Sequence, residues 1–443
     1  MKKALSILLV LVMAVAMTAC GGNSAVNVGN ELLEGYDPSV QTTLNLANPS
    51  GDALTPDEMF DTFNAKGLNI ELKVDTTPWN DFQRKLKSQL AAKSPATVFI
   101  VDSGYCASLG GKNAVMDLTA IVNRDLNKDD YLGSLYGASD AEGHLWGVPH
   151  AMNSIAIFYN KAIFDEKGIP YPTEDWTYEE MYDIAKKLTF DRDGDGEIDV
   201  YGFNYGMTNI TEGWLPVVLA SGAEPLDETR TQSTINTPEF LEGIKRFVAP
   251  VVEGFGPTNL WATNEGGTQL AFVNGKLAMF VGQSNKIVAV NSNMPEGFDY
   301  DVQMMPIGWD GNRYCVYVPN QWSIYSGADV QEKGAAWEWV KHYLSPEGQK
   351  LVADTRLSGF PIHKEALASI SDADTIPANI EAFYDGIDEY GVTLYENPCW
   401  TERRMECDAR TIELYANDGV GVEETVKEMH EFVQEALDYY YEG

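Results

Sequence analysis

Basic side chains are scarce in this sequence of 443 residues. It has 31 lysines and arginines against 66 aspartates and glutamates, which gives a formal net charge of −35 at pH 7. Such a chain repels phosphate backbones, so we expect no nucleic-acid partner. Because hydrophobic residues make up 44% and charged residues 22%, the composition excludes a disordered or fibrous chain. The length favours two lobes or domains over one.

Sequence signatures of common enzymes are also missing. We find no nucleophile elbow, no HExxH, no Walker loop and no zinc-ligand spacing. We therefore expect a protein that is not an enzyme and needs no cofactor for chemistry. One enzyme class stays open as an alternative: a secreted glycoside hydrolase, because its paired carboxylates leave no readable motif.

Cysteine is rare, with five residues in the chain. Cys106, Cys315, Cys399 and Cys407 match no zinc pattern, so we expect buried thiols. A disulfide between Cys106 and Cys315 stays open. The fifth cysteine, Cys20, belongs to a different pattern.

Long apolar runs are absent after residue 16. Two lysines precede an apolar segment at residues 4–16, which is shorter than the roughly 20 residues of a membrane-spanning helix and is typical of a signal peptide. Met17-Thr18-Ala19-Cys20 then resembles the lipobox of bacterial lipoproteins, although leucine is usual where Met17 stands.

The lipobox resemblance implies that residues 1–19 are a signal peptide and that Cys20 carries the lipid, palmitate included. Lipid on Cys20 would then be the only membrane anchor, on the outer face of the bacterial cytoplasmic membrane. Residues 20–40 are rich in glycine, asparagine and serine, which predicts a tether. Ordinary secretion with an unmodified Cys20 is the alternative.

Strand and helix patterns alternate from Thr42 onward. Residues 42–48 and 69–77 and the apolar run at 96–104 predict strands. Thr55-Pro56-Asp57-Glu58 and Thr177-Tyr178-Glu179-Glu180 predict capping boxes that begin helices. Repeated β-α units predict an α/β fold, in which ligands bind beyond the carboxyl ends of the strands. These ends include Asn48, Asp102 and Tyr105.

Five sequence blocks in a fixed order carry a family resemblance. They are VPHAMNSIAIFYNKAIFDEKGI with WTYEEMYDIAKKLT, FVNGKLAMFVGQS, MPIG, AAWEWVKHYLSPEGQKL and GFPIHKEA. Their order resembles family 1 extracellular solute-binding proteins of bacterial ABC importers, the group that includes maltose-binding protein. The resemblance implies an α/β two-lobe periplasmic-binding-protein-like fold, with crossover strands between the lobes and the ligand cleft at the lobe interface.

The resemblance also implies a division of the chain. The first lobe would hold residues 41–151 and about 306–355, and the second lobe residues 152–305 and about 356–443. Val148-Pro149 with residues 155–160 would form the first crossover, and Met305-Pro306 would lie at the second.

Candidate ligand-binding residues follow from the strand ends and from this resemblance. A sugar ring has apolar faces that stack on an indole, and its hydroxyl rim needs hydrogen bonds from polar side chains. For each tryptophan the alternative is a place in the core, and for Asp102 it is a helix N-cap. The candidates are Asn48, Asp102, Tyr105, Asn153, Trp214, Gln283, Trp322, Trp400 and Arg403.

One local motif predicts a metal site. Asp191, Asp193, Asp195 and Asp199 occupy positions 1, 3, 5 and 9 of a calcium loop, with a glycine at position 6 and the backbone carbonyl of Glu197 at position 7. The twelfth position is glycine, where an EF-hand has glutamate. We expect a structural Ca²⁺; a solvated turn rich in Asp and Gly is the alternative.

The resemblance implies a lipid-anchored, monomeric receptor that binds a sugar or oligosaccharide by lobe closure and delivers it to the permease subunits of an ABC importer. The acidity of the chain keeps a cationic solute, such as a peptide or polyamine, as an alternative ligand. A binding module without a transporter, acting as a signalling receptor, also stays open.

Overall fold

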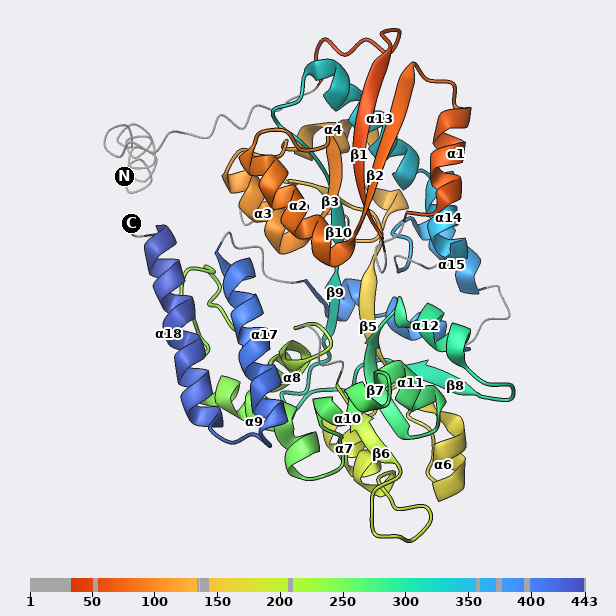
Figure 1. Ribbon diagram of the computed structural model, residues 1–443, viewed down its shortest axis with the longest axis vertical. Helices are drawn as coiled ribbons and strands as arrows, with labels where there is room; N and C mark the ends of the chain where they lie inside the picture. Colours follow the sequence, from red (N-terminus) through yellow and green to blue (C-terminus); the bar gives the residue numbers. More distant parts are fainter. Residues whose placement is uncertain are drawn as a thin grey trace, which may run out of the picture.

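The computed structural model describes residues 33–50, 55–133, 135, 143–205, 210–355, 359–371, 377–393 and 399–441. Cys20 and the expected signal peptide lie outside these residues, as does most of the expected tether. Two lobes are visible, each with its own β-sheet and flanking helices (Figure 1). The α/β two-lobe fold expected from the sequence is confirmed.

The first lobe is built on a five-stranded sheet. Its strand order is β2 (Ile70–Pro78), β1 (Thr42–Ser50), β3 (Val98–Asp102), β10 (Asn320–Ile324) and β4 (Val148–Pro149). β1 pairs in parallel with β2 and β3, whereas β10 runs antiparallel to β3. The helical segments of this lobe are α1 (Asp57–Ala65), α2 (Trp79–Ala91), α3 (Ser103–Gly111), α4 (Thr119–Asp125), η1 (Lys128–Asp130), α13 (Val330–Leu344), α14 (Pro346–Thr355) and α15 (Lys364–Ser371).

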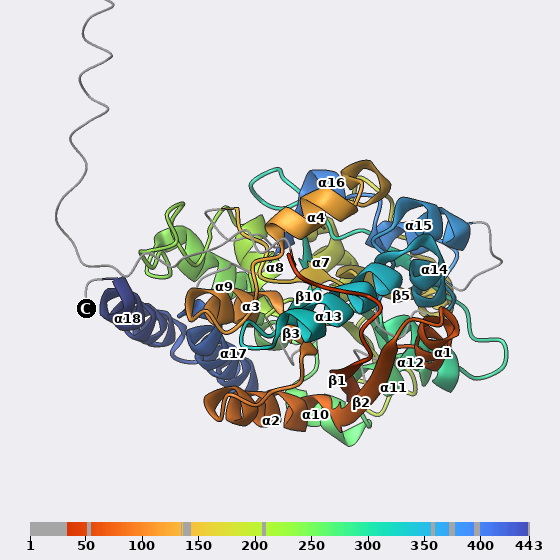
Figure 2. The same cartoon turned by 90° about the horizontal axis from the view of Figure 1, so that it is seen from above.

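The second lobe is built on a six-stranded sheet. Its path runs β11 (Gly391–Thr393), β9 (Cys315–Val318), β5 (Asn153–Asn160), β7 (Leu277–Gln283) and β6 (Tyr201–Asn204), and β8 (Tyr300–Gln303) pairs with β5. The helical segments are α6 (Lys161–Lys167), α7 (Tyr178–Lys187), α8 (Trp214–Ala220), α9 (Pro238–Val252), α10 (Asn259–Asn264), α11 (Thr268–Val273), α12 (Lys286–Asn293), η2 (Ile380–Phe383), α16 (Ile387–Tyr390), α17 (Trp400–Ala416) and α18 (Val422–Tyr441). Both views place α17 and α18 on one side of the molecule and α14 and α15 on the other (Figures 1 and 2).

The chain passes between the two sheets at neighbouring places. β4 belongs to the first sheet and β5 to the second, so one passage lies between Pro149 and Asn153. β9 belongs to the second sheet and β10 to the first, so another lies at Pro319. Reciprocal backbone hydrogen bonds of 2.8 Å between Met152 and Phe360 bring a third segment to this junction. The lobes are therefore joined by several short segments that lie close together.

Two expected lobe boundaries differ from this arrangement. Residues after Met305-Pro306 remain in the second lobe, because Ile307 bonds to Trp176 and β9 still pairs with β5. The second passage thus comes at Pro319 and not at Met305-Pro306. Residues 359–371, expected in the second lobe, pack against the first, since the amide of Leu132 donates to the carbonyl of Ile362 at 2.9 Å.

One of the two predicted capping boxes is present at the start of its helix, and the other is not. The capping box at Thr177 is present, with its side chain accepting from the amide of Glu180. The box predicted at Thr55 is wrong, because Pro56 occupies the N-cap of α1 and no side chain caps this helix. In α18 the predicted apolar face of Val422, Val426, Met429, Val433 and Leu437 is buried.

Candidate functional site

A group of polar side chains meets where β7 ends. Gln283 is the last residue of β7, and its backbone N–H donates to Glu212 Oε1 at 2.8 Å. The Nε2 atom of Gln283 donates to Thr211 Oγ1 at 2.9 Å. Thr211 and Glu212 precede α8, so the start of this helix is tied to the strand end. Glu212 is 1% exposed, and its carboxylate helps to fix this corner of the second lobe.

Asn153 connects this corner to the junction between the lobes. It begins β5, directly after the first passage, and is 5% exposed. Its Oδ1 atom accepts from Ser284 Oγ at 2.7 Å and from the amide of Asn285 at 3.2 Å. Asn153 therefore ties the start of β5 to the residues that follow Gln283. We call Asn153, Thr211, Glu212, Gln283 and Ser284 the second-lobe polar corner.

The first lobe supplies Asp102 and Tyr105 from the end of β3. The Asp102 side chain accepts from the amide of Tyr105 at 2.9 Å, which is the N-cap role that was the alternative for this residue. The Lys87 ammonium lies 5.4 Å from the centre of the Tyr105 ring. Both candidates are partly exposed at the carboxyl end of a parallel strand, where α/β sheets bind ligands.

Asn48 lies nearby in the sheet, close to the end of the neighbouring strand β1. It is 3% exposed, and its Oδ1 has no hydrogen-bond partner within the described part of the chain. A buried amide oxygen without a partner loses its hydration without compensation. Asn48 is thus a buried acceptor at the strand end and not an exposed ligand group.

Two tryptophan candidates lie in the core. Trp322 is 0% exposed and packs against His150, Trp339 and Tyr343, so its ring has no open face for a ligand. Trp214 is 1% exposed within the core of the second lobe. For both, the structure favours the core role that was the alternative. The reason is apolar burial: each ring lies on the inner face of its strand or helix.

Trp214 also contributes a polar contact. Its Nε1 donates to Asp408 Oδ1 at 2.8 Å, which ties α8 to α17. Burial raises the pKa of Asp408 to about 6, while the hydrogen bond from Trp214, attraction to Arg404 and the amide of Ile210 oppose this rise. Asp408 therefore holds the middle of α17 and the Ile210–Trp214 segment in a fixed relation.

Helix α17 carries the two remaining candidates. It begins at Trp400, whose backbone is described and whose side chain is not. Arg403 is half-buried and pairs with Glu406 one turn later, at 2.9 Å. α17 contacts α3 of the first lobe, so this helix reaches the junction of the lobes. Trp400 and Arg403 are thus placed on the element that approaches Asp102 and Tyr105 from the other lobe.

The predicted calcium loop brings part of its ligand set together. Asp191, Asp193 and Asp195 each offer a carboxylate oxygen, and these atoms lie within 4.8 Å of one another. Backbone hydrogen bonds from Gly196 and Gly194 lower the pKa of Asp191. These three carboxylates fit the oxygen ligands that Ca²⁺ prefers.

The other two calcium-loop residues are placed differently. Asp199 Oδ2 accepts from the amides of Arg192 and Asp193 at 2.7 and 3.3 Å, so this oxygen closes the turn. The amide of Glu197 donates to Asp195 Oδ1 at 2.8 Å. Neither Glu197 nor Asp199 belongs to the carboxylate group that the described residues bring together.

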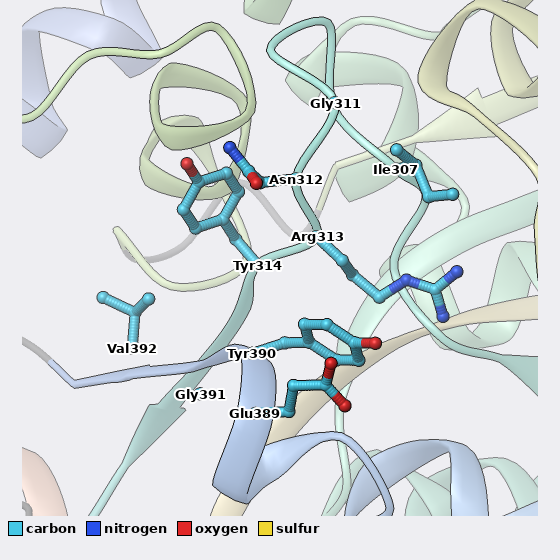
Figure 3. Close-up of a pocket in the computed structure, with 9 residues that line it drawn as sticks. All are labelled: Ile307, Gly311, Asn312, Arg313, Tyr314, Glu389, Tyr390, Gly391 and Val392. Atoms are coloured by element: carbon cyan, nitrogen blue, oxygen red, sulfur yellow. The ribbon is translucent and has the colours of Figure 1, made fainter.

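A pocket of about 510 Å³ lies elsewhere in the second lobe, between the loop at 307–314 and the α16–β11 segment (Figure 3). It shares no residue with the predicted ligand set. We call it the loop pocket; its lining residues are Ile307, Gly311, Asn312, Arg313, Tyr314, Glu389, Tyr390, Gly391 and Val392.

Sequence reasoning missed several residues of the site. Thr211, Glu212 and Ser284 have no motif of their own, and only the position of Ser284 after a predicted ligand residue gave a signal. Asp408 falls within a helical pattern, where an aspartate is ordinarily solvated. Cys106 and Cys315 are both buried and are not joined to each other, so the disulfide left open by the sequence is absent from the described residues.

Two α/β lobes, each with its own sheet and joined by short segments, form the architecture of a two-lobe binding protein. Residues 58–383, more than half of the chain, match the family described as bacterial extracellular solute-binding protein. The chain belongs to this family of binding proteins, and the resemblance inferred from the five blocks is confirmed. Within the residues that the structure describes, no helix has the length and apolarity needed to cross a membrane.

Individual relatives agree with this membership. A putative binding protein of Brucella abortus (strain 2308) is 24% identical over 321 residues, covering 70% of this chain and 72% of that protein. The maltotriose-binding protein of Pyrococcus abyssi is 24% identical over 305 residues, covering 68% and 61%. An ABC substrate-binding protein from Listeria monocytogenes, solved in complex with cycloalternan, has a TM-score of 0.78 at 23% identity and covers 90% of this chain and 99% of that one.

Proposed function

We propose that this protein is the extracytoplasmic receptor of an ABC importer, which binds a sugar or oligosaccharide between its lobes and delivers it to the permease subunits. Membership of the solute-binding family supports the receptor role. The maltotriose named for one relative and the cycloalternan of the solved structure support a carbohydrate ligand. We further propose that it acts as a monomer, held at the outer face of the membrane by lipid on Cys20.

One observation supports this proposal: each lobe carries hydrogen-bonding groups at the end of a strand. Gln283 and Asn153 are held in place from the second lobe by Glu212 and Ser284. Asp102 and Tyr105 stand at the strand end of the first lobe. Amide, carboxylate and phenol groups are the donors and acceptors that a ring of sugar hydroxyls requires. Lobe closure would bring the two sets onto opposite sides of one solute.

A thermal-shift screen of neutral sugars tests the proposal. Maltose, maltotriose and larger oligosaccharides should raise the melting temperature, because a ligand that binds only the folded protein adds about 2.7 kcal/mol at a hundredfold excess over Kd. Gln283→Ala should reduce the shift, whereas Gln232→Ala, at an exposed position away from the polar corner, should leave it unchanged.

The same screen separates the alternative ligand class. The net charge of −35 and the carboxylates of Asp102 and Glu212 favour a cationic solute as the second candidate. If peptides or polyamines raised the melting temperature and no sugar did, the carbohydrate assignment would be wrong while the receptor role would stand.

We also propose a structural Ca²⁺ in the loop at Asp191–Asp199. Asp191, Asp193 and Asp195 would hold the ion, since their carboxylate oxygens already lie within 4.8 Å of one another. The ion would relieve the mutual repulsion of these charges and fix the turn. An extracellular site of modest affinity, with Kd of about 10⁻⁴ to 10⁻³ M, would suffice.

A further inference from the structure

The loop pocket has the size and the mixed lining of a small-molecule site. Its volume of about 510 Å³ falls within the roughly 300–1,000 Å³ that is typical of ligand pockets. Ile307 and Val392 are its aliphatic side chains, and Tyr314 and Tyr390 are its aromatic ones. Arg313, Asn312 and Glu389 add hydrogen-bonding groups, so apolar and polar surfaces alternate around the space.

The polar groups of the pocket form two sets. Figure 3 shows Arg313 beside Tyr390 and Glu389, while Asn312 and Tyr314 lie together across the loop. The Tyr314 hydroxyl donates to Asp310 Oδ2 at 2.6 Å, which fixes its ring. A hydrogen bond with Glu389 is the main cause that raises the pKa of Tyr390. Two phenol rings are thus oriented by carboxylates, and each leaves ring surface along the pocket.

Arg313 is the unusual member of this lining. Its Nη1 lies 3.2 Å from Met304 Sδ, and its Nη2 donates to the backbone carbonyl of Glu174. The guanidinium carbon lies 5.6 Å from the centre of the Tyr390 ring. Burial lowers the pKa of Arg313, and within the described part of the chain no carboxylate forms an ion pair with it. Because a guanidinium has five N–H donors, donors remain for a ligand.

The charges around the pocket favour an uncharged occupant. Electrostatic interactions with Tyr390, Glu174 and Asp175 favour the charged form of Arg313 and so oppose the lowering of its pKa by burial. Glu389 lines the pocket itself. This acidic ring repels an anion, while the Arg313 guanidinium repels a cation. A neutral molecule that offers both acceptors and donors avoids both costs. Hydroxyl groups can accept from Arg313 and Asn312 and donate to Glu389.

We propose that the loop pocket binds a neutral, hydroxyl-rich small molecule, a monosaccharide, disaccharide or polyol, at a site separate from the lobe junction. The two tyrosine rings would pack against the apolar face of the molecule. The pocket adjoins the crossover strand, since Tyr314 directly precedes β9 and Gly391 pairs with Cys315. An occupant would therefore contact an element that joins the lobes. This inference does not depend on which solute binds between them.

Saturation-transfer NMR with glucose, maltose, trehalose and ribitol as probes tests the proposal. The double variant Gln283→Ala with Trp400→Ala weakens binding at the lobe junction and leaves the loop pocket intact. In this background at least one probe should still receive saturation. Adding Asn312→Trp, an exposed residue whose new side chain fills the pocket, should reduce that signal at least fivefold.

Asn293→Trp is the matched control, because Asn293 is exposed on α12 away from the pocket. It should leave the signal unchanged. Tyr390→Ala should act in the same direction as Asn312→Trp, while circular dichroism verifies that each variant is folded. The proposal is overturned if no probe receives saturation in the double variant, or if Asn312→Trp changes the signal no more than Asn293→Trp does. The thermal-shift response of Gln283→Ala reports on the lobe junction separately.

Discussion

Replacing Asp408 by asparagine should stabilise the protein at pH 7.5 and should do so about half as much at pH 5. Asp408 is partly buried between α17 and α8, and burial raises its pKa from 3.8 to about 6. An acid with a raised pKa in the folded state prefers to be protonated there. Its contribution to folding is therefore most favourable at low pH and is lost as the pH rises from 3.8 through 6.

The magnitude follows from the size of the pKa change. A rise of about 2 pKa units corresponds to about 3 kcal/mol of lost folding free energy when the pH lies above both values. At pH 5 the Asp408 carboxyl group is mostly protonated in the folded protein but mostly ionised in the unfolded chain. Roughly half of the cost in folding free energy therefore remains at this pH. Asparagine carries no charge and its Oδ1 can still accept from Trp214. We expect Asp408→Asn to gain up to about 3 kcal/mol at pH 7.5 and about half of that at pH 5.

Urea unfolding of both proteins at several pH values between 5 and 7.5 measures this difference. Asp61→Asn is the matched control, because Asp61 is exposed on α1 and its replacement should change little at any pH. A stability difference between wild type and Asp408→Asn that stays constant over this pH range would refute the reasoning, since it would mean that the buried carboxylate does not titrate there. Loss of stability at every pH would show that the hydrogen bonds to the carboxylate outweigh its burial.

Three further outcomes are expected. Trp400→Ala should weaken sugar binding by about 1 to 3 kcal/mol in calorimetry with the melting temperature of the free protein preserved, and unchanged affinity would remove Trp400 from the site. Trp322→Ala should instead lower the unfolding free energy by about 3–5 kcal/mol, because it opens a cavity in the core; a melting temperature equal to that of wild type would contradict the core placement. EDTA should lower the melting temperature and calcium restore it, with Asp193→Ala abolishing the response, whereas indifference of wild type to both would favour a solvated turn.

Local patterns predicted the local features of the site. The acidic loop could be predicted because Asp191, Asp193 and Asp195 lie within one turn of chain, and Asp102 because the apolar strand before it ends visibly. The polar corner could not be predicted as a unit. Its members Asn153, Thr211 and Gln283 are far apart in the chain. The pairing of β5 with β7 brings Asn153 near Gln283, and a hydrogen bond from Gln283 Nε2 adds Thr211.

Tryptophan showed the limit of sequence reasoning most clearly. The residues around a tryptophan in the sequence do not show whether its indole stacks on a sugar or fills the core. Trp322 is in the core because α13 places Trp339 and Tyr343 over it, and this contact joins segments that the sequence alone does not relate. The predicted crossing between the lobes at Met305-Pro306 was wrong for a related reason. Strand pairing between distant segments fixes where the chain changes lobe.

The sequence by itself determined the fold class, the acidic character and the family, because these depend on composition, periodicity and the order of short blocks. Tertiary structure alone decided which polar groups share a site, which aromatic rings are covered and where the lobes join. Those properties are set by contacts between distant segments, which bury a side chain or bring it to a shared surface. The loop pocket is one such product: residues 307–314 and 389–392 line it only because β11 pairs with β9.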